Sequence, residues 1–427
     1  MSLQYCLTLK KWDSNMRETK FKKTEAGIIP IDWNTGSLSE LFEFGNGYTP
    51  SKAVGEYWNN GNIPWFRVED IRSNGNVLND SLQHITPLAV KGELFPSNSF
   101  IISTSATVGE YAYVTVPYLA NQRFVCLIKK HDIIDDGYFL SLCQVLGQWC
   151  RDNCDQGSSF VSVNMPNFRN HEIPLPPLAE QRKFAKALSD IDGLISSLAK
   201  LIEKKQNIKT ATMQQLLTGK KRLEGFTEPW VEKEIGKLGK SYSGLTGKSA
   251  KDFGHGTAKY ITFLNVLNNP KIDTSIFENV DVSEGESQNP VRKGDLLFNT
   301  SSETPEEVGI CSAMLNNIDR LYLNSFCFGF RPNECVDSLF MSYWFRSSEG
   351  RNLMSTLAQG STRYNLSKEN MMKSTILIPK KDEQTAIAKI LDLMDNEISA
   401  LETKKAKYES IKKGMMQELL TGRIRLV

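Results

Sequence analysis

The sequence predicts an α+β fold that is built twice. Two domains with irregular mixed β-sheets are expected to be separated by two long helices, which pair as an antiparallel coiled coil about a pseudo-two-fold axis. Three observations support this prediction: a tandem repeat, a heptad pattern of apolar residues at the end of each copy, and short β-type runs separated by turns in the remainder. With 427 residues, of which 40% are hydrophobic, the chain is long enough for two cores.

The tandem repeat is clearest in the last part of each half. Residues 173–223 align with residues 376–426 without a gap, and 22 of these 51 positions are identical. Only about three identities would be expected by chance. Upstream of these segments, Trp33 corresponds to Trp230 at an offset of 197 residues. The duplicated unit is therefore one half of the molecule, a domain followed by a helix.

Each copy of the repeat ends in a long amphipathic helix. Prolines exclude a helix before Leu178, and Gly219 provides a natural stop; Pro379 and Gly422 bracket the second copy. A helix of about 40 residues would extend about 60 Å, so it needs a partner, and its own copy in antiparallel orientation is favoured. The residues predicted to form the coiled-coil interface are Leu188, Ile191, Ile195, Leu198 and Ile202 in the first helix, and Leu391, Met394, Ile398 and Leu401 in the second.

The remainder of each half contains short apolar and β-branched runs bounded by turns, a pattern typical of strands. Strands are predicted over residues 98–108, 111–116 and 124–128 in the first half, and over 259–266, 295–299 and 321–330 in the second. The two halves agree at a few anchor residues, such as Asn121 and Asn324, but most loop residues differ. A shared scaffold with different loops suits two domains that bind different targets.

The composition narrows the class of protein. The net charge is only +2, so any contact with nucleic acid must be local. The eight cysteines have no Cys-x-x-Cys spacing and there are only four histidines, so buried thiols are expected, and no metal or cofactor is predicted. No apolar run is long enough to span a bilayer, and no signal peptide is recognised, which predicts a cytoplasmic protein without a membrane partner.

Several short motifs occur in the same order along the chain. They are Gly27–Trp33, Gln156–Ser158 and Ile173–Gln181 in the first half, and Gln359–Thr362 and Glu383–Gln384 in the second. Each motif is weak by itself, but the ordered set, over nearly the whole chain, resembles the specificity subunit of a Type I restriction-modification system.

This resemblance implies a division into two target-recognition domains, residues 17–173 and 223–376, and two conserved helical spacers, residues 174–222 and 377–427. Each domain would read one half of an interrupted target in double-stranded DNA. The implied partners are two methyltransferase (modification) subunits and two restriction subunits, which carry the ATP-dependent translocase and nuclease. The chain itself would be a non-catalytic scaffold for them.

The motifs of catalysis are incomplete in this chain. The segment 244–249 resembles a phosphate-binding loop, but Tyr242 stands where the first glycine is required. Residues 164–168 resemble a motif of amino methyltransferases with the wrong spacing. Two alternatives nevertheless stay open: a self-contained DNA methyltransferase or nuclease with divergent motifs, and a coiled-coil adaptor without a role in DNA binding.

Candidates for contact with DNA can be proposed from residue type in the predicted loops. Arg and Lys suit guanine edges or phosphates, and Asn and Gln suit adenine. The candidates are Lys52, Arg67, Arg72, Ser105, Gln122 and Arg123 in the first half, and Lys248, Lys251, Asn265, Ser302, Arg363 and Tyr364 in the second. For each of them, a solvated surface side chain is the competing interpretation.

Overall fold

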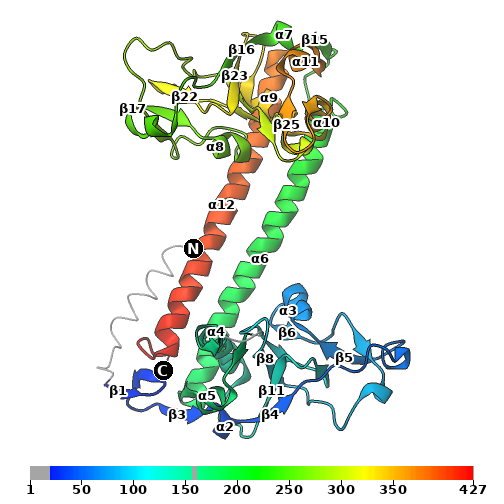
Figure 1. The fold of residues 1–427 in the computed structure, drawn as a ribbon, viewed down its shortest axis with the longest axis vertical. Helices are drawn as coiled ribbons and strands as arrows, with labels where there is room; N and C mark the ends of the chain where they lie inside the picture. The colour runs from blue at the N-terminus through cyan, green and yellow to red at the C-terminus, as the bar shows by residue number, and fades with distance from the viewer. Residues whose placement is uncertain (1–19, 156–160, 427) are drawn as a thin grey trace. The chain divides into compact units, whose positions relative to one another are not determined.

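The computed structural model describes residues 20–155 and 161–426, so the Gln156–Ser158 motif lies outside the described residues. The chain divides into two compact units. The first unit comprises the residues up to 197 together with residues 405–427, and the second comprises residues 198–404. Each unit therefore contains one mixed α+β domain and a part of each of the two long helices (Figure 1).

The first unit is built on a five-stranded sheet with the strand order β4-β11-β8-β9-β6. The central strand β8 (Ser99–Ser103) is buried over its whole length. Its side chains alternate between the two faces, because Phe100 and Ile102 join the core that contains Phe139 of helix α4, whereas Ile101 joins a second core on the other face. A continuous apolar run in the sequence is thereby explained by a strand that is covered on both faces.

The second unit repeats this design with a four-stranded sheet, β16-β23-β19-β21. Its central strand β19 (Leu296–Asn299) is also fully buried. Leu296 and Phe298 join the core beneath helix α9, and Leu297 joins a separate core on the opposite face. The repeat seen in the sequence is thus a repeat of sheet architecture.

The elements of the first domain are β1 (Phe21–Thr24), β2 (Gly27–Pro30), β3 (Asn34–Ser37), α2 (Leu38–Leu41), β4 (Phe42–Asn46), η2 (Gly55–Tyr57), β5 (Ile63–Phe66), α3 (Val68–Asn74), β6 (Val77–Leu78), β7 (His84–Ile85), η3 (Pro87–Ala89), β8, β9 (Tyr111–Val114), β10 (Leu119–Ala120), β11 (Phe124–Lys129), α4 (Asp136–Asp152), β12 (Cys154–Asp155), β13 (Ser162–Val163), α5 (Met165–Asn170) and β14 (Glu172–Leu175). The elements of the second domain are β15 (Val231–Glu234), α7 (Ile235–Leu238), β16 (Gly239–Ser243), η4 (Ala250–Asp252), β17 (Phe253–Ile261), α8 (Phe263–Asn268), β18 (Glu278–Val280), β19, β20 (Ser301–Ser302), η5 (Pro305–Glu307), β21 (Cys311–Ala313), β22 (Leu321–Leu323), β23 (Cys327–Pro332), α9 (Ser338–Arg346), α10 (Ser348–Thr356), β24 (Ala358–Gln359), β25 (Tyr364–Leu366), α11 (Lys368–Lys373) and β26 (Thr375–Ile378).

Three of the predicted strands were wrong in their extent. The run over residues 98–108 ends as a strand at Ser103. The run over 259–266 ends at Ile261, because the Thr262 side chain accepts a hydrogen bond from the Asn265 N–H and caps helix α8. The run over 321–330 is two strands, since the Asn324 side chain accepts from the Phe326 N–H at 2.8 Å and forms a turn between them.

The two long helices are α6 (Leu178–Leu216) and α12 (Lys381–Leu420), and α6 begins at the residue that the prolines predicted. Within the first unit, Asp192 of α6 pairs with Lys412 of α12 at 2.7 Å. Within the second unit, Lys205 pairs with Glu397 at 2.7 Å, and Lys209 pairs with Asp395. In the first unit, Glu180 near the start of α6 also pairs with Arg425, which follows α12. Within each unit, residue numbers thus fall along α12 as they rise along α6, so the helix segments of each unit are antiparallel.

The predicted interface residues are all buried or half-buried. Leu188, Ile191, Leu198, Ile202, Leu391 and Ile398 are buried, and Ile195, Met394 and Leu401 are half-buried. Their 3-4 spacing is the period at which helices of a coiled coil bury side chains.

Within the described ranges, no helix combines the length and the apolar character needed to cross a membrane.

Candidate DNA interface

The topology of the first sheet brings three loops to one edge. Strands β4 and β8 both run antiparallel to β11. The last residues of β4 and β8 and the first residues of β11 therefore lie together at one end of the sheet, where the connecting loops begin and end. The loops that follow or precede them, residues 47–50, 104–106 and 121–123, are together called the first rim.

Backbone hydrogen bonds hold the first rim together. The Gly47 N–H donates to the Phe124 carbonyl at 3.2 Å, and the Thr104 N–H donates to the Arg123 carbonyl at 2.9 Å. The Arg123 N–H donates to the Asn121 side chain at 3.0 Å. A Cβ atom at position 47 would lie 2.1 Å from the Asn121 carbonyl oxygen, so the close approach of the two loops requires glycine there.

The first rim contains three of the predicted contact residues, Ser105, Gln122 and Arg123. Arg67 lies beside them, because the residue before it, Phe66, accepts a hydrogen bond at its carbonyl from the Asn121 N–H of the rim. The Arg67 guanidinium stands over the ring of Trp65 at 5.7 Å from its centroid. Arg123 is exposed, whereas the Arg67 side chain is only 22% exposed. An exposed basic side chain on such a loop can reach phosphates or base edges.

The other two predicted residues of the first domain lie outside the rim. Lys52 is exposed on the segment that follows the Gly47 loop. Arg72 lies on helix α3, and its guanidinium is 3.8 Å from the Glu110 carboxylate. The side chain of Arg72 is 59% exposed, so this pair leaves it free to contact a ligand.

The second unit has a corresponding set of loops, residues 244–247, 300–302 and 324–326, which are called the second rim. The Gly244 N–H donates to the Cys327 carbonyl at 3.3 Å, and the Thr300 N–H donates to the Phe326 carbonyl at 2.9 Å. The Asn324 N–H donates to the Ile261 carbonyl at 3.1 Å. These bonds repeat, one for one, those of Gly47, Thr104 and Asn121 in the first unit.

The second rim contains Ser302 and is flanked by Arg363 and Tyr364. The Ser302 hydroxyl donates to the Glu307 carboxylate at 2.8 Å. Tyr364 pairs with Ser302 through strands β20 and β25. The exposed Arg363 donates to the Ser301 hydroxyl at 3.2 Å, and its guanidinium stands 5.9 Å from the centroid of the Phe326 ring.

The remaining predicted residues of the second domain differ in their surroundings. Lys251 is exposed on η4. Lys248 is paired with Glu286 at 2.6 Å and its side chain is only 10% exposed. Its ammonium group is therefore already held by a carboxylate within the domain.

Asn265 has a structural role in the interior of the second unit. It is fully buried, and its side chain accepts from the Asp273 N–H at 3.0 Å and donates to the Asp273 carbonyl at 2.8 Å. The corresponding residue of the first unit, Asp70, is equally buried and accepts from the Leu82 N–H at 2.5 Å. Both side chains anchor the segment that follows a short helix, so Asn265 is left out of the proposed interface.

Sequence reasoning missed one exposed residue of the second rim, Phe326. Its side chain is 57% exposed, although large aromatic side chains are usually buried. The alignment of Asn121 with Asn324 could have found it, because the same offset places Phe326 at the position of Arg123.

The repeated Glu and Arg residues form a clasp at the end of each domain. In the first unit, the Arg425 guanidinium donates to both carboxylate oxygens of Glu180 at 2.6 and 2.8 Å, and Glu180 also accepts from the Trp33 indole N–H at 3.2 Å. Arg425 also binds Asp32, and this hydrogen bond lowers the pKa of the Asp32 carboxyl group. The clasp therefore joins the start of α6 to the segment that follows α12.

The second unit contains a corresponding clasp, although the buried indole N–H of Trp230 makes no hydrogen bond to the glutamate. The Arg222 guanidinium donates to both oxygens of Glu383 at 2.6 and 2.7 Å and stands 5.9 Å from the centroid of the Trp230 ring. The side chains of the two glutamates are both 3% exposed. Removal of the arginine would leave such a carboxylate buried without a compensating charge.

The glutamines that follow these glutamates attach each domain to its helix. Gln181 accepts from the Asp135 N–H at 2.8 Å and donates to the Pro176 carbonyl at 2.8 Å. Gln384 accepts from the Asp337 N–H at 2.9 Å and donates to the Pro379 carbonyl at 2.8 Å. Asp135 and Asp337 are themselves the N-caps of α4 and α9. The repeated Glu-Gln pair is therefore a structural junction.

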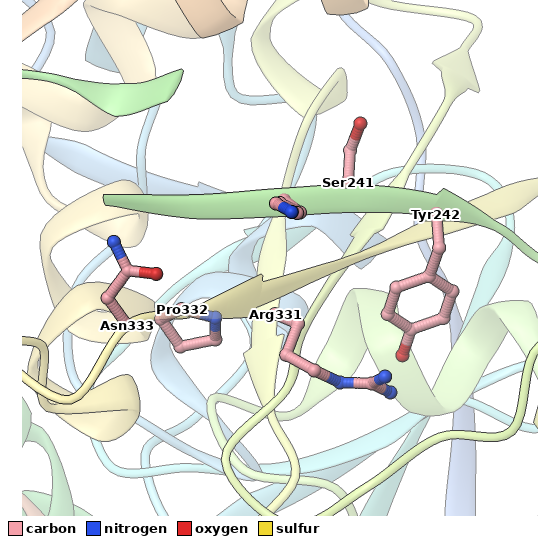
Figure 2. Close-up of a pocket in the computed structure, with 6 residues that line it drawn as sticks. Ser241, Tyr242, Arg331, Pro332 and Asn333 are labelled. Carbon is pink, nitrogen blue, oxygen red and sulfur yellow. The ribbon is translucent and has the colours of Figure 1, made fainter. Parts of the chain in front are cut away.

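Residues 20–155 and 161–426 contain no group of three or more His, Cys, Asp or Glu side chains that could hold a metal ion. A hollow beside β16 and β23 is lined by Lys240, Ser241, Tyr242, Arg331, Pro332 and Asn333 (Figure 2).

Two polar groups of this hollow, those of Arg331 and Tyr242, are already used within the fold. Arg331 binds the buried carboxylate of Asp295 at 2.8 Å, and the Tyr242 hydroxyl donates to the same carboxylate at 2.6 Å. Burial, and then the Asp295 charge, raise the pKa of Tyr242, so this hydroxyl stays protonated as a donor. Arg331 and Tyr242 are therefore both committed to Asp295.

Comparison with known proteins identifies relatives over most of the chain. Residues 30–209 and 227–412 match the family model described as "Type I restriction modification DNA specificity domain". The chain is 44% identical over 190 residues to the EcoprrI specificity subunit of Escherichia coli, which covers 44% of this chain and 47% of that relative. The match thus spans about half the length of that relative.

Two further comparisons extend over nearly the whole chain. The MjaVIII specificity subunit of Methanocaldococcus jannaschii is 25% identical over 430 residues, covering 96% of this chain and 97% of that relative. The solved S subunit of a Type I restriction-modification system from M. genitalium matches with a TM-score of 0.55 and 15% identity, covering 91% of this chain and 96% of that chain. The solved structure supports a similar fold.

Proposed function

Because the chain belongs to the family of the Type I restriction modification DNA specificity domain, we propose that it reads an interrupted target in double-stranded DNA, one half-site per unit. Its role in such a system is recognition, with the chemistry carried by partner subunits. The observation that carries the proposal is the pair of rims. They are built on the same strands and the same hydrogen bonds but carry different side chains, as two readers of different half-sites would.

The rims suit base reading because backbone hydrogen bonds fix their loops, while the side chains of Gln122, Arg123 and Phe326 are exposed. The Gln122 amide oxygen already accepts a hydrogen bond from the Thr49 hydroxyl. Base edges are read by hydrogen bonds and apolar contacts in the grooves, whereas phosphate contacts position the protein without sequence information. Gln122 and Arg123 in the first rim, and Arg363 beside the second, have suitable chemistry. Arg67 lies beside the first rim, Lys52 and Arg72 lie outside it, and all three have side chains that suit phosphates.

Replacing Arg123 by alanine is the direct test of this assignment. An arginine that reads a guanine edge contributes about 1 to 3 kcal/mol of discrimination, so the variant is expected to tolerate other bases at one position of one half-site. The measurement is the pattern of methylated sites in a host that carries the chain with its modification subunit, together with binding of the purified complex to single-base variants of the target.

The matched control is Arg182→Ala, which removes an exposed arginine of the same unit from helix α6. This variant is expected to leave the target unchanged. Uniformly weaker binding of Arg123→Ala to every sequence would assign Arg123 to a phosphate instead. An unchanged target in a folded variant would remove Arg123 from the interface.

We propose that the long helices also carry the docking surface for the modification subunits. Two apolar side chains of α6 in the second unit, Leu201 and Ile208, are 39% and 42% exposed and lie seven residues apart. This heptad spacing places them along one face of the helix, apart from the buried stripe. An exposed apolar stripe of this kind suits a partner helix. The proposed complex contains two modification and two restriction subunits and acts in the cytoplasm.

The double substitution Leu201→Glu with Ile208→Glu is expected to weaken assembly with the modification subunit about ten-fold or more, because two charges would be buried in an apolar interface. The control Asn207→Glu with Gln214→Glu adds the same charge at two exposed positions seven residues apart on α6. Gel filtration of the co-expressed subunits measures the outcome. Equal assembly of both variants would exclude this stripe as the docking surface.

A further inference from the structure

Arg123 and Phe326 occupy corresponding positions in the two rims. Each is the third residue of a turn that begins with an asparagine, and each N–H donates to that asparagine's side chain, at 3.0 Å for Arg123 and 2.8 Å for Phe326. Each carbonyl accepts from the backbone of the opposite loop, from Thr104 and Thr300, both at 2.9 Å. The duplication has therefore placed an arginine and a phenylalanine at one structural position.

The turn fixes the backbone of Phe326, although this residue is 57% exposed. Besides the backbone bond, the Thr300 hydroxyl donates to the Phe326 carbonyl at 2.7 Å. At position 244, a Cβ atom would lie 2.2 Å from the Asn324 carbonyl oxygen, so the neighbouring loop packs directly against the turn. The Arg363 guanidinium lies 5.9 Å from the ring centroid, which favours one orientation of the ring. An exposed aromatic side chain on a hydrogen-bonded turn of the rim is available for contact.

We propose that Phe326 reads the C5-methyl group of a thymine in the half-site bound by the second unit. This inference rests on the proposed function and adds the chemistry of one base position. In the major groove, arginine matches the acceptors of guanine, whereas an apolar side chain matches the thymine methyl group, which no other standard base presents. Arg363, whose guanidinium extends beside the ring, would bind the adjacent phosphate or base edge.

Replacement of single thymines by deoxyuridine tests this proposal, because uracil lacks only the methyl group. With the target known from methylation mapping, the chain assembled with its modification subunits is titrated with duplexes that carry one uracil each. At one position of one half-site, binding is expected to weaken about three- to five-fold, which corresponds to about 0.8 kcal/mol for one buried methyl group. The variant Phe326→Ala is expected to bind the thymine and uracil duplexes equally at that position.

The matched control is Leu377→Ala, which removes a 49% exposed apolar side chain of β26, outside the rim. This variant is expected to keep the full sensitivity to uracil. Uracil sensitivity that persists in Phe326→Ala, or its absence at every thymine in the wild-type complex, would overturn the inference. So would a loss of binding in Phe326→Ala that is equal for all sequences, as expected for a wedge between bases. Failure of the wild-type complex to select any duplex would instead overturn the proposed function.

Discussion

The substitution Arg425→Met is expected to lower the free energy of unfolding of the first unit by about 3 kcal/mol. Arg425 is the cation that compensates Glu180, whose side chain is 3% exposed. Removal of one partner leaves a buried charge without compensation, which costs about 3 to 5 kcal/mol in other proteins. Urea denaturation, followed by the fluorescence of Trp33 and the other tryptophans, measures the loss.

Arg423→Met is the matched control for this variant. Arg423 lies two residues earlier, is 61% exposed, and approaches Glu418 only to 3.6 Å. Its replacement is expected to change stability by about 0.5 kcal/mol or less. Equal effects of the two substitutions would contradict the clasp.

A double variant separates the charge from the packing of the arginine side chain. In Arg425→Met with Glu180→Gln, the buried group is neutral, and the glutamine oxygen can still accept from the Trp33 indole. This variant is expected to be more stable than Arg425→Met alone, because only the single variant retains an unpaired buried carboxylate. Arg222→Met with Glu383→Gln gives the same comparison in the second unit.

Removal of one heptad from each long helix is expected to change the spacing of the target. Deletion of residues 199–205 and 399–405 preserves the heptad register and shortens each helix by about 10.5 Å, which corresponds to about three base pairs. We expect binding to the original target to fall about 10³-fold, toward the non-specific level, because the two half-sites can no longer be engaged together. Methylation mapping should then detect the same half-sites with a shorter spacer.

Duplication of the same heptads provides the complementary variant. It should lengthen the spacer by about three base pairs, again without a change in either half-site. Altered half-site sequences in these variants, or an unchanged spacer, would show that the helices do not set the spacing. Circular dichroism of both variants checks that helix content changes only in proportion to length.

The amino-acid sequence by itself determined the duplication, the α+β class and the two long helices. These features depend on patterns that are local along the chain. Pro177 and Gly219 limit the first helix, and the 3-4 spacing from Leu188 to Ile202 marks its buried stripe, because a helix buries side chains according to its own period. The family resemblance depended on equally local motifs, such as the Glu-Gln pairs.

Only the tertiary structure decided which residues meet. Glu180 and Arg425 are 245 residues apart, and their pairing depends on antiparallel helix segments that no local pattern specifies. Asn265 and Phe326 illustrate the same limit: the polar residue is buried by its bonds to Asp273, and the aromatic residue is exposed by a turn inside an apolar run. Burial at a loop is set by non-local strand pairing, so residue type alone could not rank the candidates for DNA contact.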